Sequence, residues 1–372
     1  MNFDLTDERQ MLQDGLRRYL RETVTPDLLA SATESETGQS EDLWTGLAKM
    51  GVIGALFTED QGGFGGAGFD LALTFEELGR AGVFEPLLEM GVLSGGLLAE
   101  LGAADLVEEI IAGSTRVAFA HGEPAGRYEL SHVATTATAT ADGWTLHGRK
   151  SIVMALPFAS HVLVSARTSG DVRDTSGISL FLLPVEGLSF RDYPLNGGGR
   201  AAELDLEGVS VPKDALIGHE GGAWDALEHS NARAVAAISA EALGLMESIR
   251  ALTTEYLQTR KQFGKPIGKF QALQHRMADV LIEIEQARSA VINLAGHLEG
   301  DRVTRERHVS ATKNLIGRVG RLVVEESIQM HGGIGMTEEY ALGHLAKRLT
   351  MVDHRFGDTD YHLERFIRLS AA

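Results

Sequence analysis

Cysteine is absent from this chain of 372 residues. Disulfide bonds, thiolate metal sites and cysteine nucleophiles are therefore excluded, and cysteine usage says nothing about the redox compartment. The 13 histidines show neither His-x-x-x-His nor His-Glu-x-x-His spacing, so we expect no metal site. A Gly-x-Ser-x-Gly elbow is also missing, which leaves hydrolase chemistry without support. No Gly-x-Gly-x-x-Gly follows a strand-like run, so a Rossmann-type dinucleotide site is not indicated.

Long apolar runs and an excess of positive charge are also missing. The apolar segment 87–101 is interrupted by Glu89 and Glu100 and is too short to cross a bilayer. The acidic start, residues 1–5, has no basic region followed by an apolar stretch, so no signal peptide is indicated. The formal net charge of −18 argues against nucleic acid and against an anionic membrane surface. We expect a cytoplasmic globular protein with no nucleic-acid partner and no membrane span.

The hydrophobic pattern changes its period twice along the chain. The helical period holds up to about Gly113, with Ser40 as the cap of one helical segment. Strand-like runs separated by turns follow, and Asp142-Gly143 is a strong hairpin signal between two of them. After Gly222 the helical period returns almost to the end. Because 372 residues exceed a usual single core, we predict a helical domain at 1–115, a β domain at 116–222 and a helical bundle at 223–372.

Two motifs in the C-terminal part indicate chemistry. The segment Gln329–Gly335 (Gln-Met-His-Gly-Gly-Ile-Gly) lies between two long helical patterns, where glycine lets the backbone approach a ligand and helix ends leave N–H groups for a phosphate. The segment Arg260–Pro266, followed by Phe270-Gln271, offers a guanidinium that can bind phosphate oxygens in a bidentate fork. Either motif alone is more simply a helix–helix connection. Together, at this spacing in a helix–β–helix chain, they favour a nucleotide site.

With these motifs on the chain, the sequence resembles the acyl-CoA dehydrogenase family of flavoproteins over essentially its whole length. The opening Phe3–Glu8 and the loop around Gly62-Gly63 take part in the resemblance. It implies an acyl-CoA dehydrogenase-like fold with an N-terminal helical domain, a middle β-barrel or sandwich domain and a C-terminal four-helix bundle. Ala118–His121 and Phe356–Asp358 are most similar to the bacterial branch called small subunits of pimeloyl-CoA dehydrogenase, often encoded beside a larger homologous subunit.

The resemblance implies FAD-dependent α,β-dehydrogenation of an acyl-CoA thioester to the 2,3-enoyl-CoA, as in β-oxidation of fatty acids or steroid side chains. Electron-transfer flavoprotein or a similar protein would accept the electrons. The chain would form a homo-oligomer or an α2β2 heterotetramer with a larger homologue, because the family assembles its FAD site across a subunit interface. Residues that match the family's FAD contacts, or lie among them, are Arg260, Gln262, Phe263, Gln271, Gln329, Gly332 and Gly333.

The family's catalytic carboxylate is missing from both of its usual positions. The position before a C-terminal Gly-Thr corresponds to Phe356, and the second location, on the first helix of the bundle, corresponds to Ala234. Glu241 follows seven residues later on the same helical face, about 10 Å along the axis, and is our leading candidate base. A structural ion pair with an arginine of the bundle is the competing hypothesis. Asp358 is a reserve acid.

The predicted β domain departs from the family as well. Where the family has Trp-Ile-Thr against the flavin ring, this chain has Ile152-Val153-Met154, and Gly122-Glu123-Pro124 replaces Thr-Glu-Pro. Two alternatives therefore stay open: a non-catalytic partner subunit that completes the FAD site of a homologous dehydrogenase, and a flavin monooxygenase on the same fold, since that group also lacks the carboxylate.

We expect His331, in the glycine-rich turn, to be a surface or cofactor-edge residue.

Overall fold

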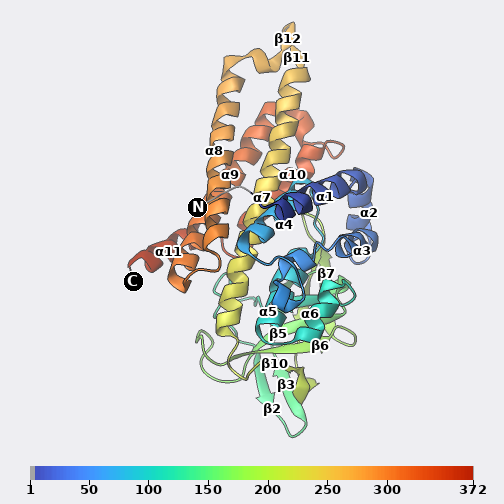
Figure 1. Cartoon of the computed structure of the whole chain (residues 1–372), viewed down its shortest axis with the longest axis vertical. Helices are drawn as coiled ribbons and strands as arrows, with labels where there is room; N and C mark the ends of the chain where they lie inside the picture. Colours follow the sequence, from blue (N-terminus) through green and yellow to red (C-terminus); the bar gives the residue numbers. More distant parts are fainter. Residues whose placement is uncertain (1–4, 372) are drawn as a thin grey trace. The chain divides into compact units, whose positions relative to one another are not determined.

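The computed structural model describes residues 5–371, which fold into two compact units (Figure 1). Phe3 and Asp4, part of the opening segment noted above, lie outside the described residues. Unit one comprises residues up to Pro26, 67–83 and 235 onward, whereas unit two comprises 27–66 and 84–234. Each unit is thus built from segments that are far apart in the sequence. The domain boundaries at 115/116 and 222/223 remain predictions.

Unit one is helical. Its glycines let two helices approach closely: a Cβ on Gly79 would lie 2.0 Å from the carbonyl oxygen of Glu241, and one on Gly244 would lie 2.0 Å from that of Glu76. Only glycine fits at such a crossing. The elements of this unit are α1 (Asp7–Thr23), α4 (Gly68–Arg80), α7 (Trp224–Thr259, from Val235), β11 (Lys261–Gln262), β12 (Lys265–Pro266), η6 (Ile267–Lys269), α8 (Gln271–His297), α9 (Arg302–His331), η7 (Gly332–Met336), α10 (Ala341–Asp353) and α11 (Thr359–Ala371).

Unit two combines short helices with two β-sheets and also holds the first residues of α7. As expected, Ser40 caps a helix, because its hydroxyl accepts from the N–H of Leu43. The helical elements are α2 (Pro26–Glu34), α3 (Glu41–Lys49), η1 (Gly54–Leu56), η2 (Glu59–Gln61), the π-helix η3 (Leu88–Gly95), α5 (Gly96–Glu100), α6 (Ala104–Ile111), η4 (Leu156–Phe158) and η5 (Lys213–Ala215).

The two sheets of unit two share one apolar core. In the larger sheet the strand order is β10-β6-β5-β2-β3-β9, with β1 paired parallel to β5, and the smaller sheet has the order β4-β8-β7. Buried Val153 and Leu204 from the small sheet join Val164 and Phe181 from the large one in a single cluster. The strands are β1 (Val117–Ala120), β2 (Thr136–Ala139), β3 (Gly143–His147), β4 (Arg149–Met154), β5 (His161–Arg167), β6 (Ile178–Pro184), β7 (Ser189–Pro194), β8 (Arg200–Asp205), β9 (Val209–Pro212) and β10 (Leu216–Ile217).

The hairpin predicted at Asp142-Gly143 is confirmed. Strands β2 and β3 pair antiparallel on either side of it, with Thr138 opposite Thr145. Gly143 is required there for space, because a Cβ would lie 2.0 Å from the carbonyl oxygen of Val211 on β9. In residues 5–371, no helix is both long and apolar enough to cross a membrane.

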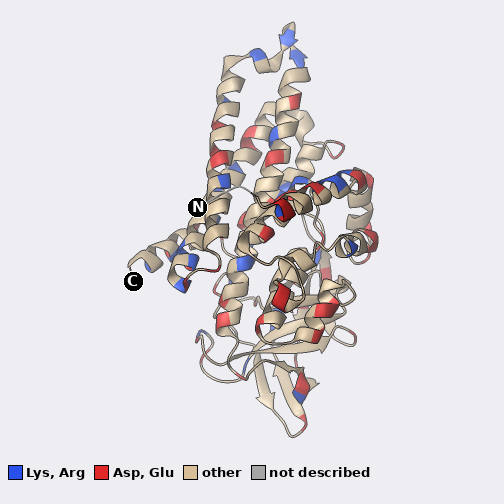
Figure 2. Ribbon diagram, in the orientation of Figure 1, with Lys and Arg blue, Asp and Glu red and all other residues tan. Residues whose placement is uncertain are grey.

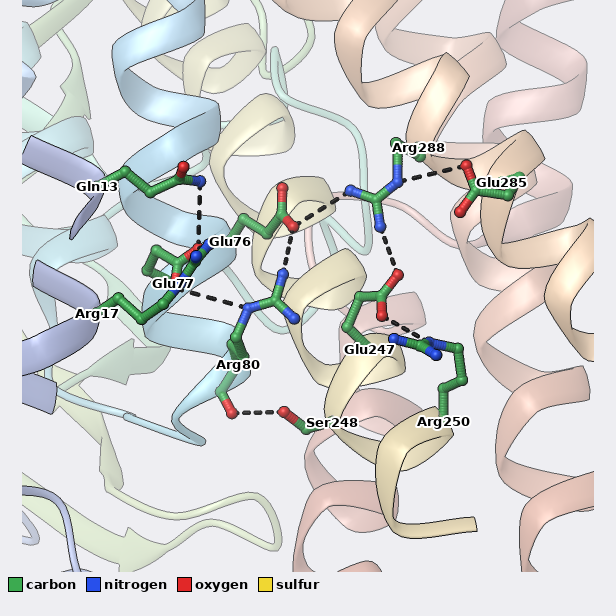
Figure 3. Close-up of polar contacts among 10 residues, drawn as sticks. All are labelled: Gln13, Arg17, Glu76, Glu77, Arg80, Glu247, Ser248, Arg250, Glu285 and Arg288. Carbon is green, nitrogen blue, oxygen red and sulfur yellow. Dashed lines mark hydrogen bonds and ion pairs between the residues drawn. The ribbon is translucent and has the colours of Figure 1, made fainter. Parts of the chain in front are cut away.

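A chain of alternating charges connects α1, α4, α7 and α8 of unit one (Figure 3). It begins with the guanidinium of Arg17, which binds the buried carboxylate of Glu77 through two nitrogens at 2.9 and 2.6 Å. Farther along, Arg288 binds both Glu76 and Glu247. Because buried carboxylates are costly without partners, this chain of ion pairs holds the four helices in register.

We predict that Arg17→Met, which keeps the apolar stem but removes the guanidinium, lowers the free energy of unfolding by about 3 kcal/mol, because it takes the bidentate partner from a buried carboxylate. Urea unfolding measures the change. Arg321→Met is the matched control, since the Arg321–Glu325 pair is 80% and 60% exposed and its loss should cost below about 1 kcal/mol. Equal effects of the two substitutions would contradict the prediction.

Candidate nucleotide-binding site

The two C-terminal motifs meet at one end of unit one. Tyr256, near the end of α7, stacks on His331, the last residue of α9, with ring centroids 4.4 Å apart. Arg260 follows one helical turn after Tyr256 and its N–H donates to the carbonyl of that residue at 2.8 Å. Gly332 directly follows His331. This aromatic contact therefore brings together two segments whose motifs lie about seventy residues apart in the sequence.

The candidate cofactor residues face solvent. The tip of the β11–β12 hairpin is formed by Phe263 and Gly264, which both have positive φ, 52° and 77°. A left-handed backbone is costly for phenylalanine. The side chain of Phe263 is 92% exposed, so burial of the ring within this chain does not offset that cost. All seven residues named in the sequence analysis are exposed in this chain: Arg260, Gln262, Phe263, Gln271, Gln329, Gly332 and Gly333.

Positive charge gathers at the same hairpin, although the protein as a whole is acidic (Figure 2). The ammonium of Lys265 lies 4.2 Å from the centre of the Phe270 ring, a cation–π contact at the start of α8. The clustered cations would attract an anion such as a pyrophosphate. They are Arg260, Lys261, Lys265 and Lys269.

The glycine-rich turn has an open surface. Gly332 adopts φ 68° and ψ −148°, a conformation that is essentially restricted to glycine. A Cβ added to Gly332 or Gly333 would meet nothing within 4 Å, so a ligand can approach the backbone there. Ile334 and Met336 of the same turn are exposed apolar residues. The open backbone and apolar side chains of this turn, with the cations of the β11–β12 hairpin, fit the mixed chemistry of a dinucleotide.

His331 was expected to be a surface or cofactor-edge residue. The first alternative was wrong, since its exposed fraction is 4%, and the second stays a prediction. Its Nδ1 lies 2.8 Å from the carbonyl oxygen of Ser327 and its Nε2 lies 3.2 Å from the hydroxyl of Tyr340. Sequence reasoning missed this because the aromatic partners, Tyr256 and Tyr340, are seventy-five and nine residues away and follow no periodic pattern with it.

Comparisons with known proteins identify the family of this chain. Family models for the N-terminal, middle and C-terminal domains of acyl-CoA dehydrogenases match residues 6–118, 118–209 and 224–368. The benzylmalonyl-CoA dehydrogenase of Aromatoleum aromaticum is 30% identical over 303 residues, which cover 78% of this chain and 79% of that protein. The chain belongs to the acyl-CoA dehydrogenase family. Its fold is that of the family, with an N-terminal helical, a middle β and a C-terminal helical domain.

Two further similarities concern assembly. The subunit CarC of the caffeyl-CoA reductase–Etf complex of Acetobacterium woodii is 26% identical over 346 residues, covering 90% of each chain. The solved structure of the Tcur3481–Tcur3483 steroid ACAD is 29% identical, with a TM-score of 0.86 and coverage of 98% of both chains. Proteins of the acyl-CoA dehydrogenase family therefore include subunits of larger complexes.

Ala234 and Phe356 are the two positions that the resemblance relates to the family's base. Ala234 is fully buried in α7, and Phe356 is half-buried with a φ of 58°. The candidate Glu241 is buried and its Oε1 accepts from Nε and Nη2 of Arg348 on α10, at 2.7 and 2.6 Å. This ion pair is the one that the competing hypothesis anticipated. The catalytic role of Glu241 remains a prediction.

The reserve acid Asp358 caps a helix. Its Oδ1 accepts from the N–H of Tyr361 at 2.8 Å, in the first turn of α11. The loop before it is held by side chains: Lys313 donates to the carbonyl of Gly357 at 2.7 Å, and His362 Nε2 donates to that of Phe356 at 2.9 Å. Residue 356 is thus rigidly presented in a left-handed conformation. The carboxylate of Asp358 is therefore directed toward the N-terminus of α11, the helix that it caps.

The β4 segment that replaces Trp-Ile-Thr is strained. The register between β4 and β8 shifts between Lys150 and Val153, and Ile152 in this bulge has a φ of 54° and is 61% exposed. A β-branched residue in this conformation is an outlier that costs of order 1–3 kcal/mol. The N–H of Ile152 donates to Glu203, which also accepts from Tyr193. The bulge therefore presents an aliphatic side chain at the position where the resemblance implies an indole.

A buried polar network in unit two was missed by sequence reasoning. The ammonium of Lys150 donates to Glu123 Oε1 at 2.7 Å and to the hydroxyl of Ser165 at 3.1 Å, and this hydroxyl also lies 2.9 Å from His121 Nδ1. Burial lowers the pKa of Lys150 to about 8. Burial raises the pKa of Glu123, but Lys150 and hydrogen bonds from Thr135 outweigh it and hold the pKa at about 2. Only the Gly-Glu-Pro motif signalled this network; Lys150 carries no local signature.

We predict that this network makes unit two acid-sensitive. Burial lowers the pKa of His121 from 6.5 to about 4, so the folded protein binds fewer protons than the unfolded chain between these pH values. Stability is then fully present above pH 6.5 and falls toward pH 4, by of order 1–3 kcal/mol for this group. His121→Gln should flatten this part of the pH dependence of Tm. His147→Gln, an exposed control, should not; an unchanged slope in His121→Gln would contradict the assignment.

Proposed function

We propose that this chain is a subunit of an FAD-dependent acyl-CoA dehydrogenase that converts an acyl-CoA thioester into the 2,3-enoyl-CoA. The proposal rests on one exposed surface at one end of unit one, which we call the half-site. It consists of Arg260 and the open turn at Gly332, whose segments are joined by the stacking of Tyr256 on His331. Family membership supports the same reaction class. The arrangement suits the nucleotide part of FAD, which is anionic at the pyrophosphate and planar at the adenine.

This chain's residues would hold FAD as follows. The guanidinium of Arg260 would bind pyrophosphate oxygens, because its fork matches their geometry. The exposed amides of Gln271 and Gln329 would donate to polar atoms of the nucleotide, and the open backbone of Gly332 and Gly333 would allow close approach. Because the half-site is exposed in the single chain, a neighbouring subunit would supply the rest of the site.

When bound, FAD supplies the acceptor for the hydride that leaves the β-carbon. The protein must remove the α-proton, and the thioester oxygen must be hydrogen-bonded as negative charge develops on it. Glu241 is the candidate for the proton transfer. Both hydrogen bonds from Arg348 end on Oε1 of this carboxylate, so Oε2 is the oxygen that would accept the proton.

A second candidate function is a non-catalytic partner that completes the FAD site of a larger homologue. It is favoured by Phe356 and Ala234 at the base positions, by the Glu241–Arg348 ion pair and by Ile152 in the β4 bulge. We infer a place in the small-subunit branch exemplified by pimeloyl-CoA dehydrogenase and an α2β2 assembly. The naming of CarC as a subunit with Etf supports electron-transfer flavoprotein as the acceptor.

Purification with and without a co-expressed larger homologue tests these functions. The dehydrogenase is supported by a yellow chain that, purified alone, reduces a dye with acyl-CoA and forms enoyl-CoA, or by a complex that loses this activity when Glu241 of this chain is replaced. The non-catalytic partner is identified by two results together. The chain is colourless when purified alone, and replacement of its Glu241 leaves the activity of the complex unchanged. Oxygen consumption without enoyl-CoA would identify a monooxygenase and contradict both. A colourless complex would overturn FAD binding.

We predict that Arg260→Gln weakens FAD binding by about 10- to 100-fold, the loss expected for a charged hydrogen bond to phosphate. Flavin fluorescence during reconstitution of the apoprotein measures the Kd. Arg321→Gln removes an exposed arginine of α9 paired with Glu325 and serves as the control. Unchanged affinity in Arg260→Gln would remove Arg260 from the site.

We predict that Glu241→Gln separates the two roles of this carboxylate. If Glu241 is the base, kcat falls by about 100-fold or more while the Kd for FAD is kept, because general-base catalysis is lost. If Glu241 only pairs with Arg348, Tm falls and the activity of the folded fraction is unchanged. Glu247→Gln, at another buried carboxylate held by arginines, is the matched control, and we expect it to lower Tm and leave turnover unchanged.

A further inference from the structure

His331 connects three elements behind the half-site, on which the proposed function rests. It is the last residue of α9, its ring stacks on Tyr256 of α7, and its Nε2 lies 3.2 Å from the hydroxyl of Tyr340, immediately before α10. The imidazole itself is buried.

The hydrogen bonds determine where the ring carries its proton. Nδ1 lies 2.8 Å from the carbonyl oxygen of Ser327, and a carbonyl oxygen can only accept. The proton is therefore on Nδ1, and Nε2 accepts from the hydroxyl of Tyr340. Burial lowers the pKa of His331, outweighing the carbonyls of Ser327 and Leu252, which favour the charged form. Burial and then Glu255 and Tyr256 raise the pKa of Tyr340, so its hydroxyl keeps the proton it donates.

Both ends of the glycine-rich segment are thereby attached to one ring. The segment begins at Gly332, directly after His331. It ends at Tyr340, whose hydroxyl donates to Nε2 of the same ring. Between them, a Cβ on Gly335 would lie 3.0 Å from Cβ of His331, so the segment also packs on the residue from the inside. The position of the open backbone at Gly332 and Gly333 depends on this attachment.

We propose that His331 is the positioning residue of the nucleotide half-site. As a neutral imidazole with its proton on Nδ1, it accepts from Tyr340 and so sets the conformation of residues 332–340 that would face the pyrophosphate and adenosine of a dinucleotide. It acts through the turn and touches no ligand itself. Disturbing the His331–Tyr340 hydrogen bond therefore changes nucleotide affinity without removing any nucleotide contact.

The protonation state is tested without any cofactor. ¹⁵N-histidine labelling of the apoprotein, with the His331 signals assigned by their loss in His331→Asn, reports which ring nitrogen carries hydrogen. We expect a protonated Nδ1 and an unprotonated Nε2 at neutral pH, the reverse of the usual preference of free histidine. A proton on Nε2, or on both nitrogens, would overturn the proposal whether or not the protein binds FAD.

The coupling to the half-site is tested with FAD as the probe, on the protein or complex that binds it. Tyr340→Phe removes only the donor, and His331→Asn keeps a donor for Ser327 but loses the acceptor. Each should weaken FAD binding by about 3- to 10-fold, the size expected for one hydrogen bond. The double variant should be no weaker than the worse single one, because both remove the same bond.

Tyr19→Phe, on α1 of the same unit, is the matched control and should leave the Kd unchanged. If Tyr340→Phe lowers Tm but binds FAD like the wild type at a temperature where both are folded, the role of His331 is only structural and the proposal is wrong. Additive effects in the double variant would also contradict it. If the wild-type protein and its complex bind no FAD, the proposed function fails while the tautomer result still decides the state of His331.

Discussion

The stacking of Tyr256 on His331 is the contact on which the candidate site depends. It brings the end of α7 to the end of α9, and with them an arginine-bearing hairpin and a glycine-rich turn that lie about seventy residues apart in the sequence. The hydrogen bond to Tyr340 extends the same ring to the start of α10. The hairpin supplies exposed cations and the turn supplies open backbone and apolar side chains, and each of them would be an ordinary helix connection in isolation.

Buried charge has a different role in each unit. In unit one, arginine–glutamate pairs tie α1, α4, α7 and α8 together, and Glu241 is one of several carboxylates held by an arginine. In unit two, Lys150 and Glu123 lie in a network with His121, where burial and charge shift all three pKa values. The environment of Glu241 therefore resembles the structural pairs around it.

Local patterns predicted the hairpin at Asp142-Gly143 and the cap at Ser40, because periodicity and turn chemistry act over a few residues, whereas the fold class followed from the family resemblance. The same patterns could not predict that His331 is buried or that Lys150 pairs with Glu123, since these contacts join distant segments. The left-handed backbone at Ile152 and Phe356 was equally hidden, because neither residue type favours it and only the surrounding hydrogen bonds maintain it.

A structure of the FAD-loaded protein, alone or with its larger homologue, tests the central claim most directly. We expect Arg260 and Gln329 of this chain to contact the nucleotide part of an FAD whose flavin ring is held by a neighbouring subunit. An FAD bound elsewhere, with both side chains still facing solvent, would contradict the assignment of the half-site.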